Sequence, residues 1–155
     1  MKMQSDRISK DNPENERRWY YDACSLEYKS CYGEILSNNR HHKIRAIASH
    51  LSLGEAYANC RIKGGEQANA FIELMTQLGN LLNIVENDGI DRIFAKIREG
   101  FPALSITDAI HLATAIAYKC EVMKTEDPDL CGLPKKKVQK IAEELSCPKF
   151  SITQG

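Results

Sequence analysis

The chain has 155 residues, which is enough for one domain with a substantial hydrophobic core. Hydrophobic residues make up 43% of it, a share that excludes wholesale disorder. The formal net charge is zero, which excludes attachment to nucleic acid by bulk charge, so any basic surface has to be local.

The first half of the chain predicts two strands, each followed by helical sequence. Residues 1–17 are polar and lack periodicity, and we expect a flexible or loosely docked arm there. A short aromatic strand is expected at 18–21, ending on Asp22, and a polar segment compatible with a helix follows it. Residues 44–48 form the second strand candidate, and the helix after them is expected to stop at Gly64.

The second half continues this alternation of helices and strands. We expect helices at about 66–78, 90–100, 105–120 and 138–145, and strands at 81–85, 122–125 and 150–152. Strands separated by helices predict an α/β fold with a parallel sheet covered on both faces. We predict one domain over residues 18–147 and a tail over 148–155 that can add an edge strand to the sheet.

The most informative stretch runs from Leu104 to Leu130. Ser105 or Thr107 can cap a helix, and Asp108 falls in its first turn. Small apolar residues then follow at helical spacing, so this helix can lie close to whatever it covers. After a short strand, the turn at 125–129 carries three acids. The helix start and the strand end together predict an acidic site at one rim of the sheet.

Four carboxylates are candidate ligands, although each also has a local structural explanation. Asp22 could cap the next helix or make a turn. Glu55 has capping-box spacing from Ser52. Asp108 is favoured at a helix start by the helix dipole, and Asp127 fits an ordinary surface turn. None of the four indicates catalysis alone.

The positions of these acids in the predicted sheet favour a common site. Strand ends and the following helix starts lie along one rim of a parallel sheet, where ligands bind. Carboxylates gathered there repel one another unless a cation lies among them. Oxygen ligands favour one or two Mg²⁺ or Mn²⁺ ions over zinc or copper, and such ions can activate water and stabilise charge on a phosphate. The sequence therefore predicts a metal-dependent phosphodiesterase.

Four stretches of the chain also resemble, in order and spacing, the motifs of the PIN domain family. They are WYYD at 19–22, SHLSLGE at 49–55, SITDAIHLATA at 105–115 and TEDPDL at 125–130. The resemblance implies a Rossmann-like, three-layer α/β/α fold with a central parallel sheet of about four to five strands. It also implies a Mg²⁺- or Mn²⁺-dependent endoribonuclease. Many compact members are VapC-type toxins that pair with an antitoxin and form homodimers.

This resemblance assigns roles to individual residues. Asp22, Glu55, Asp108 and Asp127 would be the catalytic and metal-binding acids, and Asp129 would be an outer acid. Two local basic groups could hold the RNA backbone, and their residues are Lys135, Lys136 and Lys137 in one and Arg40 and Lys43 in the other. With zero net charge, we expect that contact to be sensitive to salt.

Other features predict less specific properties. The six cysteines are widely spread without a C-x-x-C pair, which favours reduced thiols over zinc or disulfides. The polar start and the lack of an apolar run of about 18 residues predict a soluble, cytoplasmic protein. His111 lies opposite the apolar stripe of its helix and is expected to be structural or partly exposed.

Two alternative functions belong to other classes. A PIN-like fold without nuclease activity could act as a binding partner in a complex. A receiver-type signalling domain could accept a phosphoryl group on a strand-end aspartate, but that class needs a lysine after a later strand. Lys124 instead lies inside its strand, before the acidic turn.

Overall fold

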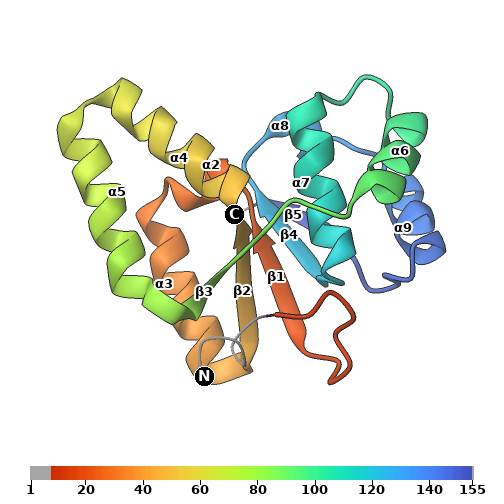
Figure 1. Cartoon of the computed structure of the whole chain (residues 1–155), viewed down its shortest axis with the longest axis horizontal. Helices are drawn as coiled ribbons and strands as arrows, with labels where there is room; N and C mark the ends of the chain where they lie inside the picture. The colour runs from red at the N-terminus through yellow and green to blue at the C-terminus, as the bar shows by residue number, and fades with distance from the viewer. Residues whose placement is uncertain (1–7, 155) are drawn as a thin grey trace.

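The structure is a computed structural model that describes residues 8–154. Its centre is a five-stranded sheet in the order β3-β2-β1-β4-β5 (Figure 1). The strands are β1 (Arg17–Tyr21), β2 (Ile44–Ser49), β3 (Leu82–Val85), β4 (Val122–Thr125) and β5 (Ser151–Gln154). All neighbouring strands run parallel, which confirms the predicted parallel α/β fold.

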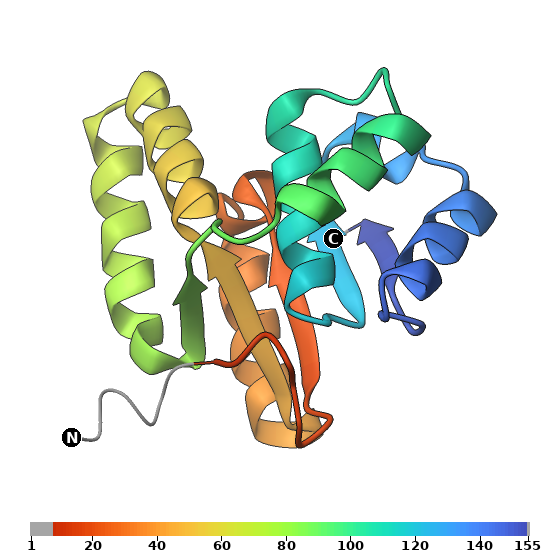
Figure 2. The same cartoon turned by 45° about the vertical axis from the view of Figure 1, so that its right-hand side comes forward.

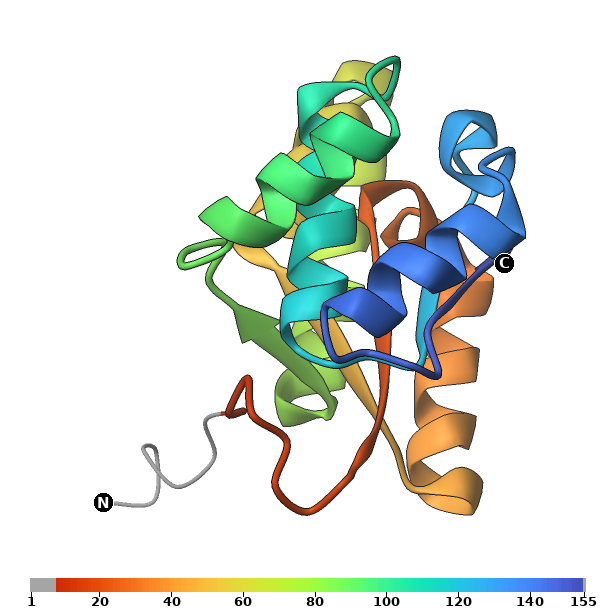
Figure 3. The same ribbon diagram turned by 90° about the vertical axis from the view of Figure 1, so that its right-hand side faces the viewer.

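Helices cover both faces of the sheet and complete three layers (Figures 1 and 2). On one side lie α2 (Ala23–Leu26), α3 (Lys29–Ser37), α4 (His50–Lys63) and α5 (Gly65–Leu78). On the other side lie α6 (Asp91–Gly100), α7 (Ile106–Ala117) and α9 (Lys135–Glu144), the layer that faces the viewer in Figure 3. Short turns complete the chain, namely the π-helix η1 (Asn38–His42), the 3-10 helix η2 (Gly79–Leu81) and α8 (Pro128–Cys131).

The sheet separates two hydrophobic cores, because successive strand residues point to opposite faces. Tyr20 and Ile47 pack into the core under α6, α7 and α9, whereas the neighbouring Tyr21 and Ala46 pack into the core under α2 to α5. Helix α7 is buried almost all round because it carries many small residues, including Ala109 and Ala113. This burial agrees with the expectation that small residues let the helix lie close to whatever it covers.

The amino-terminal segment is described from residue 8, and the part of the predicted arm at 1–7 lies outside the described residues. Residues 8–16 are docked on the sheet by polar contacts. The Arg18 guanidinium, buried in the first strand, donates to the Ser9 carbonyl at 2.7 Å and pairs with Glu16 at 3.0 Å. Strand β1 begins at Arg17, one residue before the expected start.

The cysteines, the helices and the tail bear on three further expectations. All six cysteines are free thiols. No helix within residues 8–154 combines the length and apolar character needed to cross a membrane. At the other end of the sheet from β3, β5 pairs with β4 and forms the edge strand expected in the tail.

Candidate metal centre

Asp22 stands at the carboxyl end of β1 and is held by two hydrogen bonds. As the N-cap of α2, it accepts the backbone N–H of Ser25 on Oδ1 at 3.2 Å. Its Oδ2 accepts the hydroxyl of Thr125, the last residue of the adjacent strand β4, at 2.5 Å. Burial raises the pKa of Asp22 above its ordinary value, while these two hydrogen bonds oppose that rise by stabilising the carboxylate. Asp22 is therefore both a helix cap and a buried acid at the sheet rim.

Asp108 and Asp127 are fixed by helix starts on either side of the same rim. Ser105 caps α7, and its hydroxyl accepts the backbone N–H of Asp108 at 3.1 Å. Asp127 caps α8 with Oδ1, which accepts the backbone N–H of Asp129 at 2.8 Å. These caps occur because aspartate and serine oxygens satisfy N–H groups that the first helical turn leaves unpaired. The acids thus sit on short, locally determined backbone segments.

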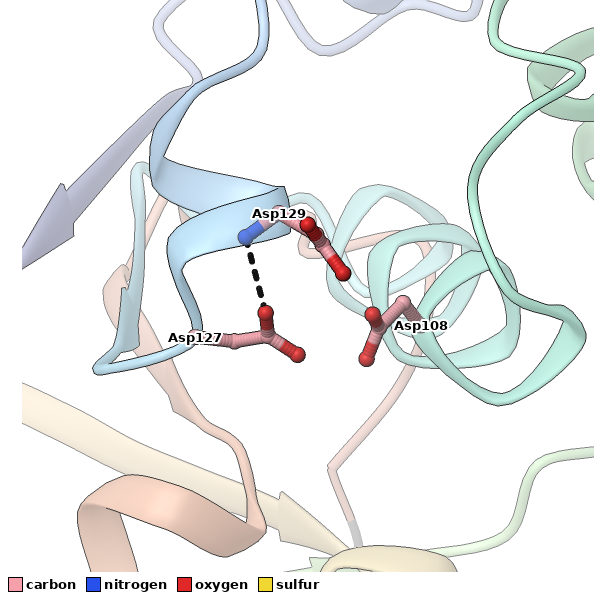
Figure 4. A group of neighbouring side chains, drawn as sticks. All are labelled: Asp108, Asp127 and Asp129. Atoms are coloured by element: carbon pink, nitrogen blue, oxygen red, sulfur yellow. Dashed lines mark hydrogen bonds between the residues drawn. The ribbon is translucent and has the colours of Figure 1, made fainter.

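The carboxylates of Asp108, Asp127 and Asp129 converge (Figure 4). One oxygen from each lies within 4.8 Å of the others. Partial burial raises the pKa of Asp108 to about 6, and the hydrogen bond and negative charge of Asp127 contribute to the rise. The raised pKa reflects burial of Asp108 and repulsion by Asp127, and a divalent cation could relieve this repulsion.

Glu55 is positioned differently from these three acids. It is the sixth residue of α4, whose cap is Ser49, in a capping box completed by Ser52. The interpretation of Glu55 as the partner of Ser52 in a capping box is therefore wrong, because the helix begins three residues earlier than that spacing requires. Glu55 instead places Oε1 2.6 Å from Nε2 of His111.

His111 is buried, with 2% of its surface exposed, and it belongs to α7. The expectation of a partly exposed side chain is wrong, although a structural role fits its contacts. The helix is covered on more sides than its apolar stripe indicates. His111 follows Asp108 by three residues, which places both side chains on one face of α7. This spacing is the sequence signal that could have identified His111 as a neighbour of the site.

Three of the five predicted acids form one cluster, and the other two lie outside it. Asp108, Asp127 and Asp129 form the cluster, and the outer role of Asp129 stays a prediction. Asp22 is linked to it through the Thr125 hydroxyl, which also accepts the backbone N–H of Asp127 at 3.0 Å. Glu55 lies outside the cluster, and its Oε1 contacts His111, one turn along α7 from Asp108. Sequence reasoning did not single out Thr125, whose role depends on the register between β1 and β4.

Comparison with known proteins adds a family to this geometry. The family model described as PIN domain matches residues 26–136, which is most of the chain. The chain belongs to the PIN domain family. The matched stretch contains four of the five predicted acids and begins just after Asp22. PIN domains are generally nucleases, and they typically use divalent metals.

Two solved structures share the PIN fold with this chain. The first is a chain in the crystal structure of VapBC2 from Rickettsia felis, which is bound to a DNA fragment from the VapBC2 promoter. It aligns with a TM-score of 0.61 and 12% identity, over 88% of this chain and 98% of that chain. PAE2754 from Pyrobaculum aerophilum gives a TM-score of 0.56 at 17% identity, covering 84% of this chain and 96% of that one. No curated protein matches the sequence significantly.

The donor set of this PIN domain fits a hard divalent cation. The cluster offers carboxylate oxygens alone, which are the ligands that Mg²⁺ and Mn²⁺ prefer. Two of its three members are half-buried and the third, Asp129, is exposed, so the cluster remains accessible from solvent. An ion can therefore reach these carboxylates from solvent.

The two predicted basic groups lie at different ends of this PIN domain. Lys135 to Lys137 begin α9, shortly after α8 and its acids. Arg40 and Lys43 precede β2, so they lie at the amino ends of the strands, whereas the acids lie at the carboxyl ends (Figure 1). This placement favours the lysine group, and it separates the Arg40 loop from the acidic cluster.

Proposed function

We propose that this PIN domain is a Mg²⁺- or Mn²⁺-dependent endoribonuclease that hydrolyses phosphodiester bonds of RNA. The observation that carries the proposal is the convergence of the Asp108, Asp127 and Asp129 carboxylates within 4.8 Å. These residues come from two helix starts at the carboxyl edge of a parallel sheet, which is where α/β folds bind ligands. They also lie in the stretch that matches a family of nucleases.

In this mechanism, Asp108, Asp127 and Asp129 would hold the cation, with Asp22 beside them and Glu55 at the rim. A bound divalent cation would lower the pKa of water and stabilise the charge on the phosphate. The chain contributes preorganisation, because the caps at Ser105 and Asp127 fix the acids before substrate binds. Lys135, Lys136 and Lys137 would contact the RNA backbone through charge.

The proposal extends to biological partners. The structural likeness to a chain of VapBC2 supports a role as the toxin of a toxin-antitoxin pair, acting on RNA in the cytoplasm as a homodimer with a cognate antitoxin. Copurification of this chain with the product of a neighbouring small gene would test the antitoxin part. Light scattering of the purified chain would test the dimer.

The decisive experiment measures cleavage of a mixed single-stranded RNA with Mn²⁺, with EDTA, and by an Asp108→Asn variant. We expect cleavage with Mn²⁺ and none with EDTA. The cleavage rate of the variant should fall by about a hundredfold, because one cluster ligand is removed. Asp11→Asn, an exposed aspartate outside the cluster, is the matched control and should cleave normally. Cleavage that survives both EDTA and Asp108→Asn would contradict the assignment. Tight Mn²⁺ binding without cleavage would favour the alternative of an inert PIN-like binding partner.

A further inference from the structure

A buried chain of hydrogen bonds ends on Glu55. Nε2 of His111 lies 2.6 Å from Oε1 of Glu55, and Nδ1 of the same ring lies 2.7 Å from the Tyr20 hydroxyl. Tyr20 is fully buried and His111 nearly so, whereas the Glu55 side chain is 34% exposed. The three residues come from β1, α7 and α4. These hydrogen bonds therefore connect the sheet to helices on both of its faces.

The direction of each hydrogen bond follows from the groups involved. A carboxylate can only accept, so Nε2 of His111 carries the proton donated to Glu55. In the neutral ring, Nδ1 then accepts the Tyr20 hydroxyl, which keeps its proton because burial raises the pKa of Tyr20. The Tyr20 oxygen in turn lies 2.9 Å from the Ser49 hydroxyl and 3.0 Å from the Ser52 hydroxyl.

At the end opposite Glu55, this series of hydrogen bonds reaches the backbone at the start of α4. Ser49 and Ser52 form the capping box of α4, in which each hydroxyl accepts the backbone N–H of the other residue. The start of α4 is thus tied through Tyr20 and His111 to Glu55, one and a half turns along the same helix. His111 cannot turn its ring without breaking a buried hydrogen bond on each side, which is costly.

We propose that His111 is a positioning residue that fixes Glu55 at the carboxyl edge of the sheet, where the acidic cluster also lies. The inference rests on the proposed nuclease function and deepens it, since it assigns a task to a residue outside the cluster. A free glutamate side chain samples many rotamers, and ordering it during the reaction costs conformational entropy. The contact with His111 orders Oε1 in advance and leaves Oε2 available at the exposed end.

The test is a double-mutant cycle on single-turnover RNA cleavage with Mn²⁺, using His111→Phe in the wild-type and Glu55→Ala backgrounds. His111→Phe keeps an aromatic ring and removes both nitrogens. In the wild-type background we expect a loss of about tenfold or more, as for other residues that orient a ligand. In the Glu55→Ala background we expect less than about a twofold change, because the residue that His111 orders is gone.

Two further variants separate positioning from damage to the fold. Thr114→Val removes two other side-chain hydrogen bonds of α7 and should leave cleavage unchanged. Thr114 accepts one of them from Asn87 and donates the other to the Ile110 carbonyl. Tyr20→Phe removes a single hydroxyl and should show the same dependence on Glu55 if His111→Phe does not fold. Equal losses in the two Glu55 backgrounds would overturn the proposal. A loss in Thr114→Val as large as that in His111→Phe would overturn it as well.

A spectroscopic measurement distinguishes failure of this inference from failure of the nuclease proposal. Should the wild-type chain bind Mn²⁺ and cleave no RNA, the nuclease proposal fails, and nitrogen-15 NMR of the His111 ring in metal-free protein still tests the contact. A slowly exchanging Nε2 proton in the wild type that is lost in Glu55→Ala supports His111 as the residue that holds Glu55. A proton on Nδ1 and none on Nε2 would overturn that role.

Discussion

Thr125 donates its hydroxyl proton to Oδ2 of Asp22, joining the ends of β4 and β1 beneath the acidic cluster. The same hydroxyl accepts the backbone N–H of Asp127. One buried side chain therefore sets the position of two acids that lie more than a hundred residues apart in sequence. The parallel register of β1 and β4 makes this contact possible, because it brings Tyr21 beside Lys124 and leaves the next residues adjacent.

Replacing this hydroxyl should destabilise the fold as well as the site. We predict that Thr125→Val lowers the free energy of unfolding by about 1–3 kcal/mol, because the buried Asp22 carboxylate loses a donor. Urea denaturation at neutral pH measures the change. Thr125→Ser keeps the hydroxyl and should recover most of the loss. Equal stability of the valine variant and the wild type would show that water replaces the hydroxyl.

The raised pKa of Asp108 predicts how the metal-free protein responds to pH. The folded chain binds this proton more tightly than the unfolded chain, because the pKa rises from 3.8 to about 6. The free energy of unfolding should therefore fall as pH rises from about 4 to about 6 and remain lower above that range, by about 1–2 kcal/mol after solvent screening. Denaturation in EDTA at several pH values measures this slope.

Asp108→Asn should reduce that slope and raise the stability of the metal-free protein at pH 7, since the variant cannot carry the repelled charge. Asp22 has a raised pKa as well and contributes in the same direction, so part of the slope should persist. Asp11→Asn serves as the control and should keep the full slope. An Asp108→Asn variant with the wild-type slope would contradict the assignment of the raised pKa to this pair.

Metal binding should stabilise the folded chain through the same three carboxylates. At a free Mn²⁺ concentration a hundred times the dissociation constant, we predict an increase of about 2.7 kcal/mol in the free energy of unfolding. Asp129→Asn should weaken Mn²⁺ binding in calorimetry, because Asp129 belongs to the cluster. A wild-type affinity for Mn²⁺ in this variant would support the outer role of Asp129 that the sequence predicts.

The two basic groups should differ in their effect on RNA binding. We predict that Lys135→Ala with Lys136→Ala weakens binding to single-stranded RNA and flattens its dependence on salt, because fewer counterions are released. Arg40→Ala with Lys43→Ala is the matched double variant, and its amino-end position predicts no such change. Fluorescence anisotropy at several salt concentrations, in EDTA to prevent cleavage, compares the two. A larger loss in the Arg40 pair would place the RNA at the opposite edge.

The sequence by itself determined the elements of the fold and the location of the acids along the chain. Hydrophobic periodicity and turn residues are local signals, so they identify helices such as α5 and α6 and the strands between them. Alternation of strands and helices then implies a parallel sheet with its ligand edge at the strand ends. The candidate acids at Asp22, Asp108 and Asp127 follow from that reasoning, since each borders a strand or a helix start.

Only the tertiary structure decided which side chains meet. Asp129 joins the cluster because α8 turns its carboxylate toward Asp108, and Glu55 is bound to His111 because α4 and α7 approach each other across the sheet rim. The Arg40 loop is separated from the acids by the length of the strands. Such contacts depend on the packing of segments far apart in sequence and on side-chain rotamers, which local periodicity does not encode.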